Sequence, residues 1–273
     1  MAGPPDEPAA AEPLPEAPPP ELCLGCQRPL KPGAAFCSGC GRPKGSRARP
    51  PETTRDRRLK AERAWSDLRG LFLLYGLLLG TSAVVMTIAR FSEPSFGLLL
   101  GALAADTVII VAAAARHRRA LGPSMLRPGF GLLGYAGVAL AAPVLLVLVL
   151  AYVKILPHAF GLPTSRDLDE YEGRGLVVAL ALGALWPAVF EELAFRGVIF
   201  PVLRRHAAVW EALLVSSFAF AILHLSVPSL VTHLPMGLWF GWLRQRSGSL
   251  WPGVFAHGLH NGLILVGEHA GWL

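Results

Sequence analysis

The chain has 273 residues, of which 53% are hydrophobic and only 16% are charged. A soluble globular domain carries about 25% charged residues, so this composition excludes an ordinary soluble protein and indicates a membrane protein. The formal net charge is +6, but the basic residues are not gathered on one face or in one arm, as they are in nucleic-acid-binding proteins. We therefore expect the lipid bilayer as a partner and no nucleic acid.

Two polar segments flank the cysteine-rich part of the N-terminal region. Residues 1–21 consist mainly of Pro, Ala and Glu and have no apolar run that could offset the entropy of ordering. This composition predicts a disordered tail. Residues 44–68 are basic and predict a linker, which either lies along an anionic leaflet or is a solvated topology signal.

All four cysteines lie within residues 22–43, in two Cys-x-x-Cys pairs formed by Cys23 with Cys26 and Cys37 with Cys40. Turn-forming residues follow each pair, so that two thiolates can point at one centre. Two such pairs provide the tetrahedral four-sulfur shell that structural zinc prefers. The alternative is two disulfides, which need an oxidising compartment. The spacing predicts a zinc ribbon that folds with its metal.

A closed shell of four cysteines leaves no open position on the metal, so we expect a structural or docking role for the ribbon rather than a catalytic one. The segment resembles the small zinc-ribbon modules found at the ends of many bacterial membrane proteins. A cytoplasmic protein is the expected partner of such a docking module.

Seven hydrophobic segments follow the linker. About 20 apolar residues are needed to cross the roughly 30 Å hydrocarbon layer. Together these segments predict an all-α polytopic membrane domain over residues 69–273, with about seven transmembrane helices. The segments lie near residues 69–89, 96–115, 130–153, 175–200, 208–226, 229–244 and 250–268.

The charges of the loops predict the orientation of these segments. Lysine and arginine are concentrated in alternate loops, such as "RHRRALGPSMLRP" and "RQRSGS". Since basic loops stay on the cytoplasmic side, we expect a multi-pass protein of the cell membrane with a cytoplasmic N-terminus and an outside C-terminus. This orientation puts the cysteines in a reducing compartment, which favours zinc over disulfides.

Three of the hydrophobic segments contain the polar side chains that most need an explanation. A charge at the centre of the bilayer costs about 2.5–3.5 kcal/mol on insertion scales, so such residues are rare and are usually functional. The fourth segment contains two adjacent glutamates and an arginine, the fifth a histidine, and the seventh two histidines and an asparagine. These residues are Glu191, Glu192, Arg196, His224, His257, His260 and Asn261.

Helix geometry gives the two adjacent glutamates different roles. Glu192 and Arg196 are four residues apart with the carboxylate first, which is the favourable order for an ion pair on one helix face. Glu191 lies about 100° around the helix and is left to face another group. Pro187 removes a backbone hydrogen bond one turn earlier, which predicts a kink that opens a polar pocket.

The other polar residues share helix faces at the same four-residue spacing. His224 follows Phe220, and Asn261 follows His257. At about 1.5 Å of rise per residue, these groups reach a depth similar to that of Glu191. A carboxylate and a histidine that face one water can activate it as a nucleophile. A histidine N–H and an asparagine amide can hold the oxyanion that develops on an attacked carbonyl.

Three motifs, in this order on successive segments, resemble those of the CAAX-processing and bacteriocin-processing (CPBP) intramembrane endopeptidases, also called the type II CAAX prenyl endopeptidase or Abi family. The resemblance covers about residues 130–268. Together the three motifs are specific, whereas each alone is weak. They read Glu191-Glu192-x-x-x-Arg196, Phe220-x-x-x-His224 and His257-x-x-x-Asn261.

The resemblance implies an intramembrane protease that cleaves a peptide bond of a peptide or a membrane protein. It implies that Glu191 and His224 activate the water. It further implies that His257 and Asn261 stabilise the oxyanion. The remaining motif residues are expected to organise the site, and they are Glu192, Arg196 and Phe220.

Three alternatives stay open. One glutamate and two histidines from three helices could form a zinc shell with an open water position, although no carboxylate is clearly placed behind each histidine, which favours a metal-free mechanism. The protein could instead be a non-enzymatic membrane scaffold or a bacteriocin-immunity-type protein. A transporter is the third alternative, since intramembrane acids also relay protons. We expect His233 to be packed or pore-facing, and we leave open whether His260 supports the site.

Overall fold

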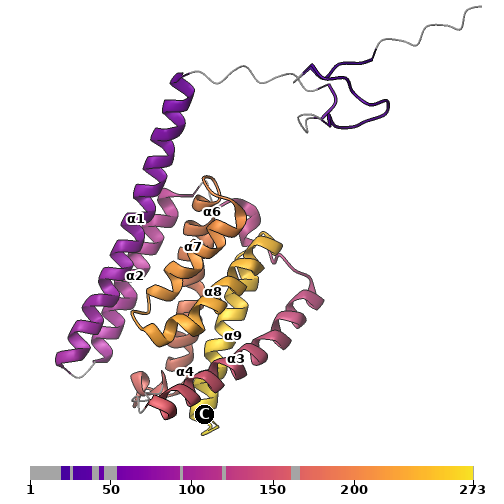
Figure 1. The fold of residues 1–273 in the computed structure, drawn as a ribbon. Coiled ribbons are helices and arrows are strands. Elements are labelled where there is room, and N and C mark those ends of the chain that lie inside the picture. Colours follow the sequence, from indigo (N-terminus) through magenta and orange to yellow (C-terminus); the bar gives the residue numbers. More distant parts are fainter. Residues whose placement is uncertain are drawn as a thin grey trace, which may run out of the picture. The chain divides into compact units, whose positions relative to one another are not determined.

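The computed structural model describes residues 20–24, 27–38, 43–45, 54–92, 95–118, 121–160 and 167–272. The chain divides into two units, residues 1–59 and residues 60–273. Every regular element described in the larger unit is a helix, which confirms the all-α prediction (Figure 1). The described part of the smaller unit contains two isolated β-bridges and the first residues of α1.

Each of the seven predicted hydrophobic segments lies in helical structure. The first three correspond to α1, α2 and α3, and the last three to α7, α8 and α9. Short 3₁₀ helices, η1 and η2, precede and follow α3. The bounds are α1 (Thr54–Phe91), α2 (Phe96–Arg116), η1 (Pro123–Leu126), α3 (Leu132–Phe160), η2 (Asp167–Tyr171), α7 (Val209–Ile222), α8 (Val227–Ser247) and α9 (Trp251–His269). Residues 54–68, which the sequence assigns to the linker, form the first turns of α1.

Four helical stretches of the described chain are long and apolar enough to cross a bilayer. They are α1, α2, residues Leu132–Tyr152 of α3 and the stretch Leu176–Leu203. The helix α7 is apolar but has only 14 residues. The multi-pass membrane architecture is therefore confirmed, while the number of seven crossings stays a prediction.

The fourth hydrophobic segment is one helical stretch that contains two wider turns. The wider turns are π-helical, and such turns are rare and often lie at functional sites. They flank α5, which carries both glutamates of the first motif. The stretch consists of α4 (Leu176–Ala179), the π-helical η3 (Leu180–Leu185), α5 (Trp186–Glu192), the π-helical η4 (Leu193–Ile199) and α6 (Phe200–Leu203).

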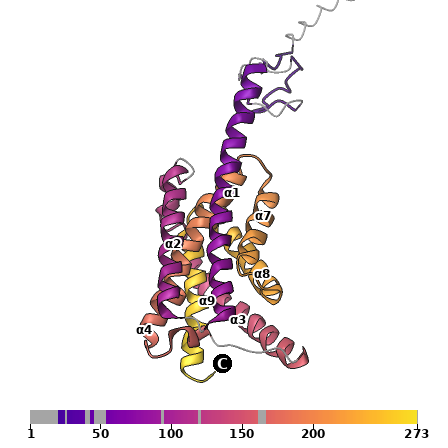
Figure 2. The ribbon, with the colours of Figure 1, turned by 90° about the vertical axis from the view of Figure 1, so that its left-hand side faces the viewer.

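The helices α1 and α2 run antiparallel along one side of the bundle (Figures 1 and 2). Leu71, Leu74 and Leu78 recur at the three- and four-residue spacing of one helix face, and they pack into a core shared with α2 and η4. The Thr81 hydroxyl donates a hydrogen bond of 2.6 Å to the carboxylate of Asp106 on α2. This side of the bundle therefore supports the segment that carries the first motif.

The last helix, α9, has the most central position for the site. It contacts η3 and α5 of the fourth segment, and also α3 and α8. The helices α7 and α8 pack closely against each other (Figure 1). The segment of the first motif therefore contacts the helices of the other two motifs, since α5 contacts α9 and η4 contacts α7.

The smaller unit contains two matching turns around the cysteine pairs. Leu22 bridges to Pro29, and Phe36 bridges to Pro43, so each bridge joins the residue before a first cysteine to the residue seven positions later. Cys23 and Cys37 are buried and form a small cluster with Leu30. Cys26 and Cys40 lie outside the described residues. The zinc ribbon and the boundaries of the predicted segments therefore stay predictions. The disordered tail also stays a prediction, since residues 1–19 lie outside the described part.

Candidate active site

The predicted ion pair between Glu192 and Arg196 is present. Arg196 Nη1 donates to Glu192 Oε1 at 2.9 Å, and Arg196 Nη2 donates to the carbonyl of Gly237 at 2.9 Å. Both charged side chains are fully buried. The guanidinium carbon also lies 4.7 Å from the ring centroid of Phe220, so the aromatic residue of the second motif packs on the arginine of the first. Since a buried charge is costly without a partner, these contacts fix the turn that carries both glutamates.

His257 lies between the two glutamates. Its Nε2 is 3.9 Å from Glu191 Oε2, and its Nδ1 is 3.5 Å from Glu192 Oε1. The imidazole stacks on Phe240 with a centroid distance of 5.1 Å and an interplanar angle of 20°. Glu192 therefore faces both Arg196 and His257, whereas the sequence suggested Arg196 alone.

Exposure separates the two glutamates. The Glu191 side chain is 20% exposed, whereas that of Glu192 is 0% exposed. Glu191 lines a cavity of about 560 Å³, and Glu192 is not part of its lining. Only Glu191 can therefore meet a molecule that enters the cavity, as the different helix faces of the two residues predict.

The cavity also brings together polar side chains of three other helices. His224 follows α7, His233 comes from α8, and His260 and Asn261 come from α9. Three of the four predicted catalytic residues thus line one space. His257 is not among the lining residues, but it contacts Glu191 from the side.

His224 and His233 form a stacked pair. Their ring centroids are 3.7 Å apart, with an interplanar angle of 35°. Nδ1 of His224 lies 3.1 Å from the carbonyl oxygen of Phe220, and Nδ1 of His233 lies 3.0 Å from that of Ser229. Because a carbonyl oxygen only accepts, we assign the proton to Nδ1 in each ring, which leaves Nε2 as the acceptor of a neutral imidazole.

Asn261 is held by the π-helical η3 of the fourth segment. Its Nδ2 donates to the carbonyl of Gly183 at 3.1 Å. Pro187, four residues after Gly183, has no N–H with which to satisfy that carbonyl. The proline that the sequence marked as a kink therefore also provides an anchoring point for the third motif.

Three residues that line the cavity were not predicted as site residues from the sequence. They are His233, His260 and Tyr171. The short turn between α7 and α8 could have indicated that His233 lies near His224, since both residues are close to this turn. His260 is buried, and its Nδ1 has no hydrogen-bond partner among the described residues. Tyr171 of η2 had no sequence signal, and its hydroxyl packs so close to Gly183 that a Cβ there would lie 2.8 Å from it.

The outer end of the cavity is acidic. Asp167, Glu170 and Glu268 line it together with Tyr171. The carboxylate of Glu268 accepts hydrogen bonds from the backbone N–H groups of Asp167 and Leu168, at 3.1 and 2.7 Å. Burial, followed by the charges of Glu170 and Asp167, raises the pKa of Tyr171 to about 12. The tyrosine hydroxyl is therefore protonated at neutral pH and available as a donor.

The described side chains were also compared with the needs of a metal site. Nowhere in the described ranges do three or more His, Cys, Asp or Glu side chains come close enough to hold a metal ion. In particular, the pairing of His257 with two carboxylates differs from the His₂Glu shell that was considered as an alternative.

Known proteins resemble the part of the chain that carries the three motifs. Residues 173–263 match the family model described as "Type II CAAX prenyl endopeptidase Rce1-like". The "Putative membrane peptidase YdiL" of Bacillus subtilis (strain 168) is 32% identical over 103 residues, which are 38% of this chain and 41% of that protein. The match thus spans about two fifths of the relative's length. No solved structure gives a significant match. The family match covers every residue from Glu191 to Asn261 and therefore all three motifs.

Proposed function

We propose that the protein is an intramembrane endopeptidase that hydrolyses a peptide bond of a peptide or a membrane protein, using a water molecule activated by Glu191 and His224. The observation that carries the proposal is the shared cavity, in which Glu191, His224 and Asn261 come from different parts of the chain and face one space of about 560 Å³. The similarity of residues 173–263 to CAAX-type endopeptidases gives independent support.

In this mechanism Glu191 is the general base. Its carboxylate takes a proton from the water while Nε2 of His224 accepts a hydrogen bond from the other O–H. The water oxygen forms a bond to the carbonyl carbon of the substrate, and the carbonyl π electrons move to the oxygen. When the tetrahedral intermediate collapses, the C–N bond breaks and Glu191 returns its proton to the leaving amine.

The oxyanion is assigned to His257 and Asn261. One N–H of the Asn261 amide bonds to Gly183, so the second remains for a substrate oxygen. The 3.9 Å between His257 Nε2 and Glu191 Oε2 is wide enough for a bridging oxygen atom rather than a direct hydrogen bond. Preorganised donors of this kind lower the barrier by about 2.7–4 kcal/mol each in other hydrolases.

Glu192, Arg196 and Phe220 are assigned a positioning role. Glu192 and Arg196 form a buried ion pair that packs on Phe220. Glu192 also contacts Nδ1 of His257 and so orients this ring. The chemistry that we propose needs no metal in the membrane site. Glu191 supplies the proton transfers, His224 orients the water, and His257 and Asn261 supply the charge stabilisation.

The test is cleavage by the purified protein in lipid nanodiscs. Glu191→Gln and His224→Ala should each lower turnover by about 10²–10⁴-fold, the usual contribution of general acid–base catalysis. Glu172→Gln and His269→Ala are matched controls, because both residues are exposed and outside the cavity. Full activity of folded Glu191→Gln would overturn the mechanism.

Because the substrate is unidentified, peptides released from membranes of cells that produce the wild type are compared by mass spectrometry with those from Glu191→Gln cells. Peptides that are present only with the wild type identify substrates and the cleaved bond. A scaffold, an immunity-type protein or a transporter would produce identical peptide profiles in both cells.

We further propose that Cys23, Cys26, Cys37 and Cys40 bind one structural Zn²⁺ ion in a docking module for a cytoplasmic protein. The matching bridges around the two cysteine pairs and the burial of Cys23 and Cys37 support this assignment. Metal analysis of the full chain should give about one zinc per chain, and the quadruple Cys→Ser variant should give none. Zinc retained by that variant would assign the metal to another site.

The proposed orientation has a cytoplasmic N-terminus and an outside C-terminus. The basic loops between alternate helices support it. Single cysteines introduced at Arg118 and Glu172 in a cysteine-free chain should differ in labelling by a reagent that does not cross membranes. The cysteine at position 172 should be labelled in intact cells and that at position 118 only after lysis.

A further inference from the structure

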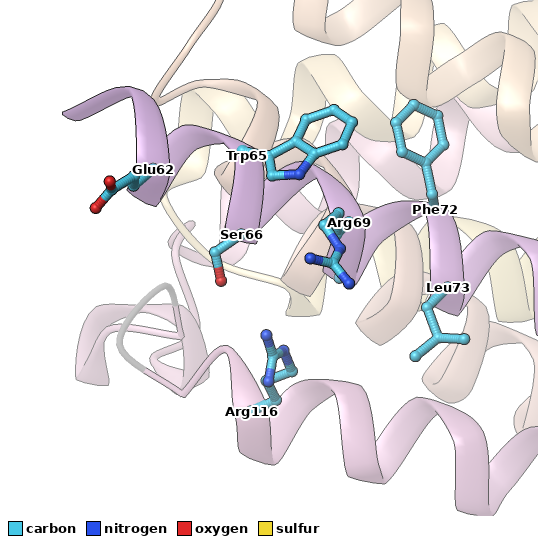
Figure 3. Close-up of a pocket in the computed structure, with 8 residues that line it drawn as sticks. Glu62, Trp65, Ser66, Arg69, Phe72, Leu73 and Arg116 are labelled. Carbon is cyan, nitrogen blue, oxygen red and sulfur yellow. The ribbon is translucent and has the colours of Figure 1, made fainter. Parts of the chain in front are cut away.

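A second pocket lies where α1 and α2 reach the predicted cytoplasmic boundary of the membrane. It has a volume of about 840 Å³ and contains none of the residues of the proposed active site. Figure 3 shows its lining, which comes from the N-terminal half of α1 and from the last residue of α2. The lining residues are Glu62, Trp65, Ser66, Arg69, Gly70, Phe72, Leu73 and Arg116.

Two arginines from different helices meet in this pocket. Arg69 of α1 and Arg116 of α2 direct their guanidinium groups into the space between the helices, and Ser66 faces the same space (Figure 3). Neither arginine has an ion-pair partner within the described part of the chain. Like charges that face each other repel, so an anion placed between the two guanidinium groups would be favourable.

Asp67, the acidic residue that follows Ser66 on α1, is engaged elsewhere. The carboxylate of Asp67 lies 3.1 Å from Arg205 Nη1 and 3.3 Å from His206 Nε2, in the turn after α6. Glu62 lines the pocket, but its carboxylate lies at the outer end, away from the two guanidinium groups (Figure 3). The centre of the pocket is therefore basic.

The side chains at the end of α2 pack against Gly70 of α1. A Cβ added at Gly70 would lie 2.8 Å from His117 Nε2 and 3.4 Å from Arg116 Nε. A larger residue at position 70 would displace the His117 side chain, which therefore packs on the backbone of Gly70. The two arginines are thereby held on either side of one space, rather than on separate surfaces.

Two apolar residues of the pocket, Phe72 and Leu73, lie on the membrane side of Arg69, and Trp65 lies one turn before it. Trp65, Phe72 and Leu73 are 60%, 69% and 63% exposed. Arg69 stands at the start of the first apolar run and Arg116 at the end of the second. Phe72 and Leu73 follow Arg69 by about one turn, so a charged level borders an apolar level, as in the headgroup region of a bilayer.

We propose that this pocket binds the phosphate group of an anionic phospholipid of the cytoplasmic leaflet. Arg69 and Arg116 contact the phosphate oxygens, Ser66 donates a hydrogen bond, and the acyl chains lie along Phe72 and Leu73. Guanidinium groups are well suited to phosphate because they offer parallel N–H donors. The exposed apolar side chains favour a lipid over free phosphate, which needs no apolar surface.

Such a lipid would connect α1 to α2. Since Leu71, Leu74 and Leu78 of α1 pack in the same core as η4, the bound lipid would stabilise the support of the segment with Glu192 and Arg196. Binding to the folded state raises stability by mass action. The inference does not depend on the proposed protease activity.

The experiment uses the full chain purified in a neutral detergent. Native mass spectrometry and thermal unfolding are recorded during titration with phosphatidylglycerol, phosphatidylcholine and inorganic phosphate. The variant Arg69→Gln/Arg116→Gln is compared with Arg63→Gln/Arg118→Gln, which removes the same charge from exposed positions outside the pocket. Size-exclusion chromatography checks folding, and the single Arg116→Gln variant replaces the double variant if that one aggregates.

We expect phosphatidylglycerol to bind and to raise the melting temperature, and phosphatidylcholine to do neither. The pocket variant should bind about 10- to 30-fold more weakly, since each arginine near a lipid surface contributes about 1 kcal/mol. The control variant should bind like the wild type. Equal losses in both variants would overturn the site, and so would stabilisation by inorganic phosphate that matches that by phosphatidylglycerol.

Discussion

Asn261 donates a hydrogen bond of 3.1 Å from its side-chain amide to the backbone carbonyl of Gly183. The bond joins the third motif to η3, which leads into the helix of the first motif, at a carbonyl that Pro187 cannot satisfy. The side chain therefore has an anchored orientation on the wall of the cavity. Its proposed role at an oxyanion depends on this anchoring, because a donor must be in place before charge develops.

The coupling between Asn261 and Pro187 can be measured with a double-mutant cycle. Asn261→Leu should lower the free energy of unfolding by about 0.5–1.5 kcal/mol, because it removes the hydrogen bond to the carbonyl of Gly183. In the background of Pro187→Ala the loss should be smaller, since alanine restores a backbone donor. Unfolding in mixed detergent micelles gives both values. Identical losses in the two backgrounds would show that the carbonyl has another donor.

The two adjacent glutamates should respond differently to the loss of charge. Glu192→Gln leaves the buried Arg196 without its counter-charge, and breaking a buried pair costs about 3–5 kcal/mol. Glu191→Gln should leave stability nearly unchanged, because Glu191 faces the cavity. Thermal unfolding of both variants is the measurement. The assignment of roles would be reversed if Glu191→Gln were the less stable protein.

The stack of His233 on His224 predicts a positioning role for His233. His233→Ala should lower turnover by about 10- to 100-fold, because the loss of the stack allows the catalytic ring to move. His233→Phe keeps a flat ring and should retain most of the activity. Both variants should show a KM close to that of the wild type. If His233→Ala turned over substrate as fast as the wild type, His233 would have no positioning role.

Gly253 leaves space for the carboxylate of Glu192. A Cβ at this position would lie 2.6 Å from Glu192 Oε2, whereas a Cβ at Gly258 on the same helix would make an ordinary contact of 3.4 Å with Ala188. Gly253→Ala should therefore destabilise the protein by about 1–3 kcal/mol, as overpacking does. Gly258→Ala is the matched control and should be close to neutral. Similar unfolding temperatures for the two variants would contradict the clash.

Asp67 should stabilise the contact between α1 and the turn after α6 in a pH-dependent way. Burial alone would raise its pKa, but hydrogen bonds and charges of Arg205 and His206 bring the pKa below its ordinary value of 3.8. A carboxylate with a lowered pKa contributes stability above its unfolded pKa and loses it as the pH falls through the folded value. The wild type should therefore be more stable than Asp67→Asn at pH 6–7 and lose this advantage below about pH 4.

Unfolding curves of both proteins between pH 3 and 7 check this expectation. Asp106→Asn is a useful comparison, because its carboxylate accepts a hydrogen bond from a threonine rather than facing a cation. A constant difference between the wild type and Asp67→Asn across the whole range would show that the ion pairs contribute nothing.

The spacing of residues along the chain was sufficient to predict the contacts within one helix. The pair of Glu192 and Arg196 follows from the four-residue repeat, and so does the separation of Glu191 from Glu192, because the α-helix fixes the angle between neighbouring side chains. The hydropathy of the seven segments was sufficient to predict an all-α membrane fold, since a helix in lipid forms all the hydrogen bonds of its own backbone.

Contacts between helices were decided by the tertiary structure. The stack of His224 on His233, the position of His257 between two carboxylates and the bond from Asn261 to Gly183 depend on the rotation and the closeness of packed helices. The pocket of Arg69 and Arg116 depends on the packing of α2 side chains against Gly70 of α1. By itself the sequence determined which residues each helix carries and which of them share a face, because these are properties of one helical repeat. Only the tertiary structure decided which faces meet, because that depends on how side chains of several helices interlock.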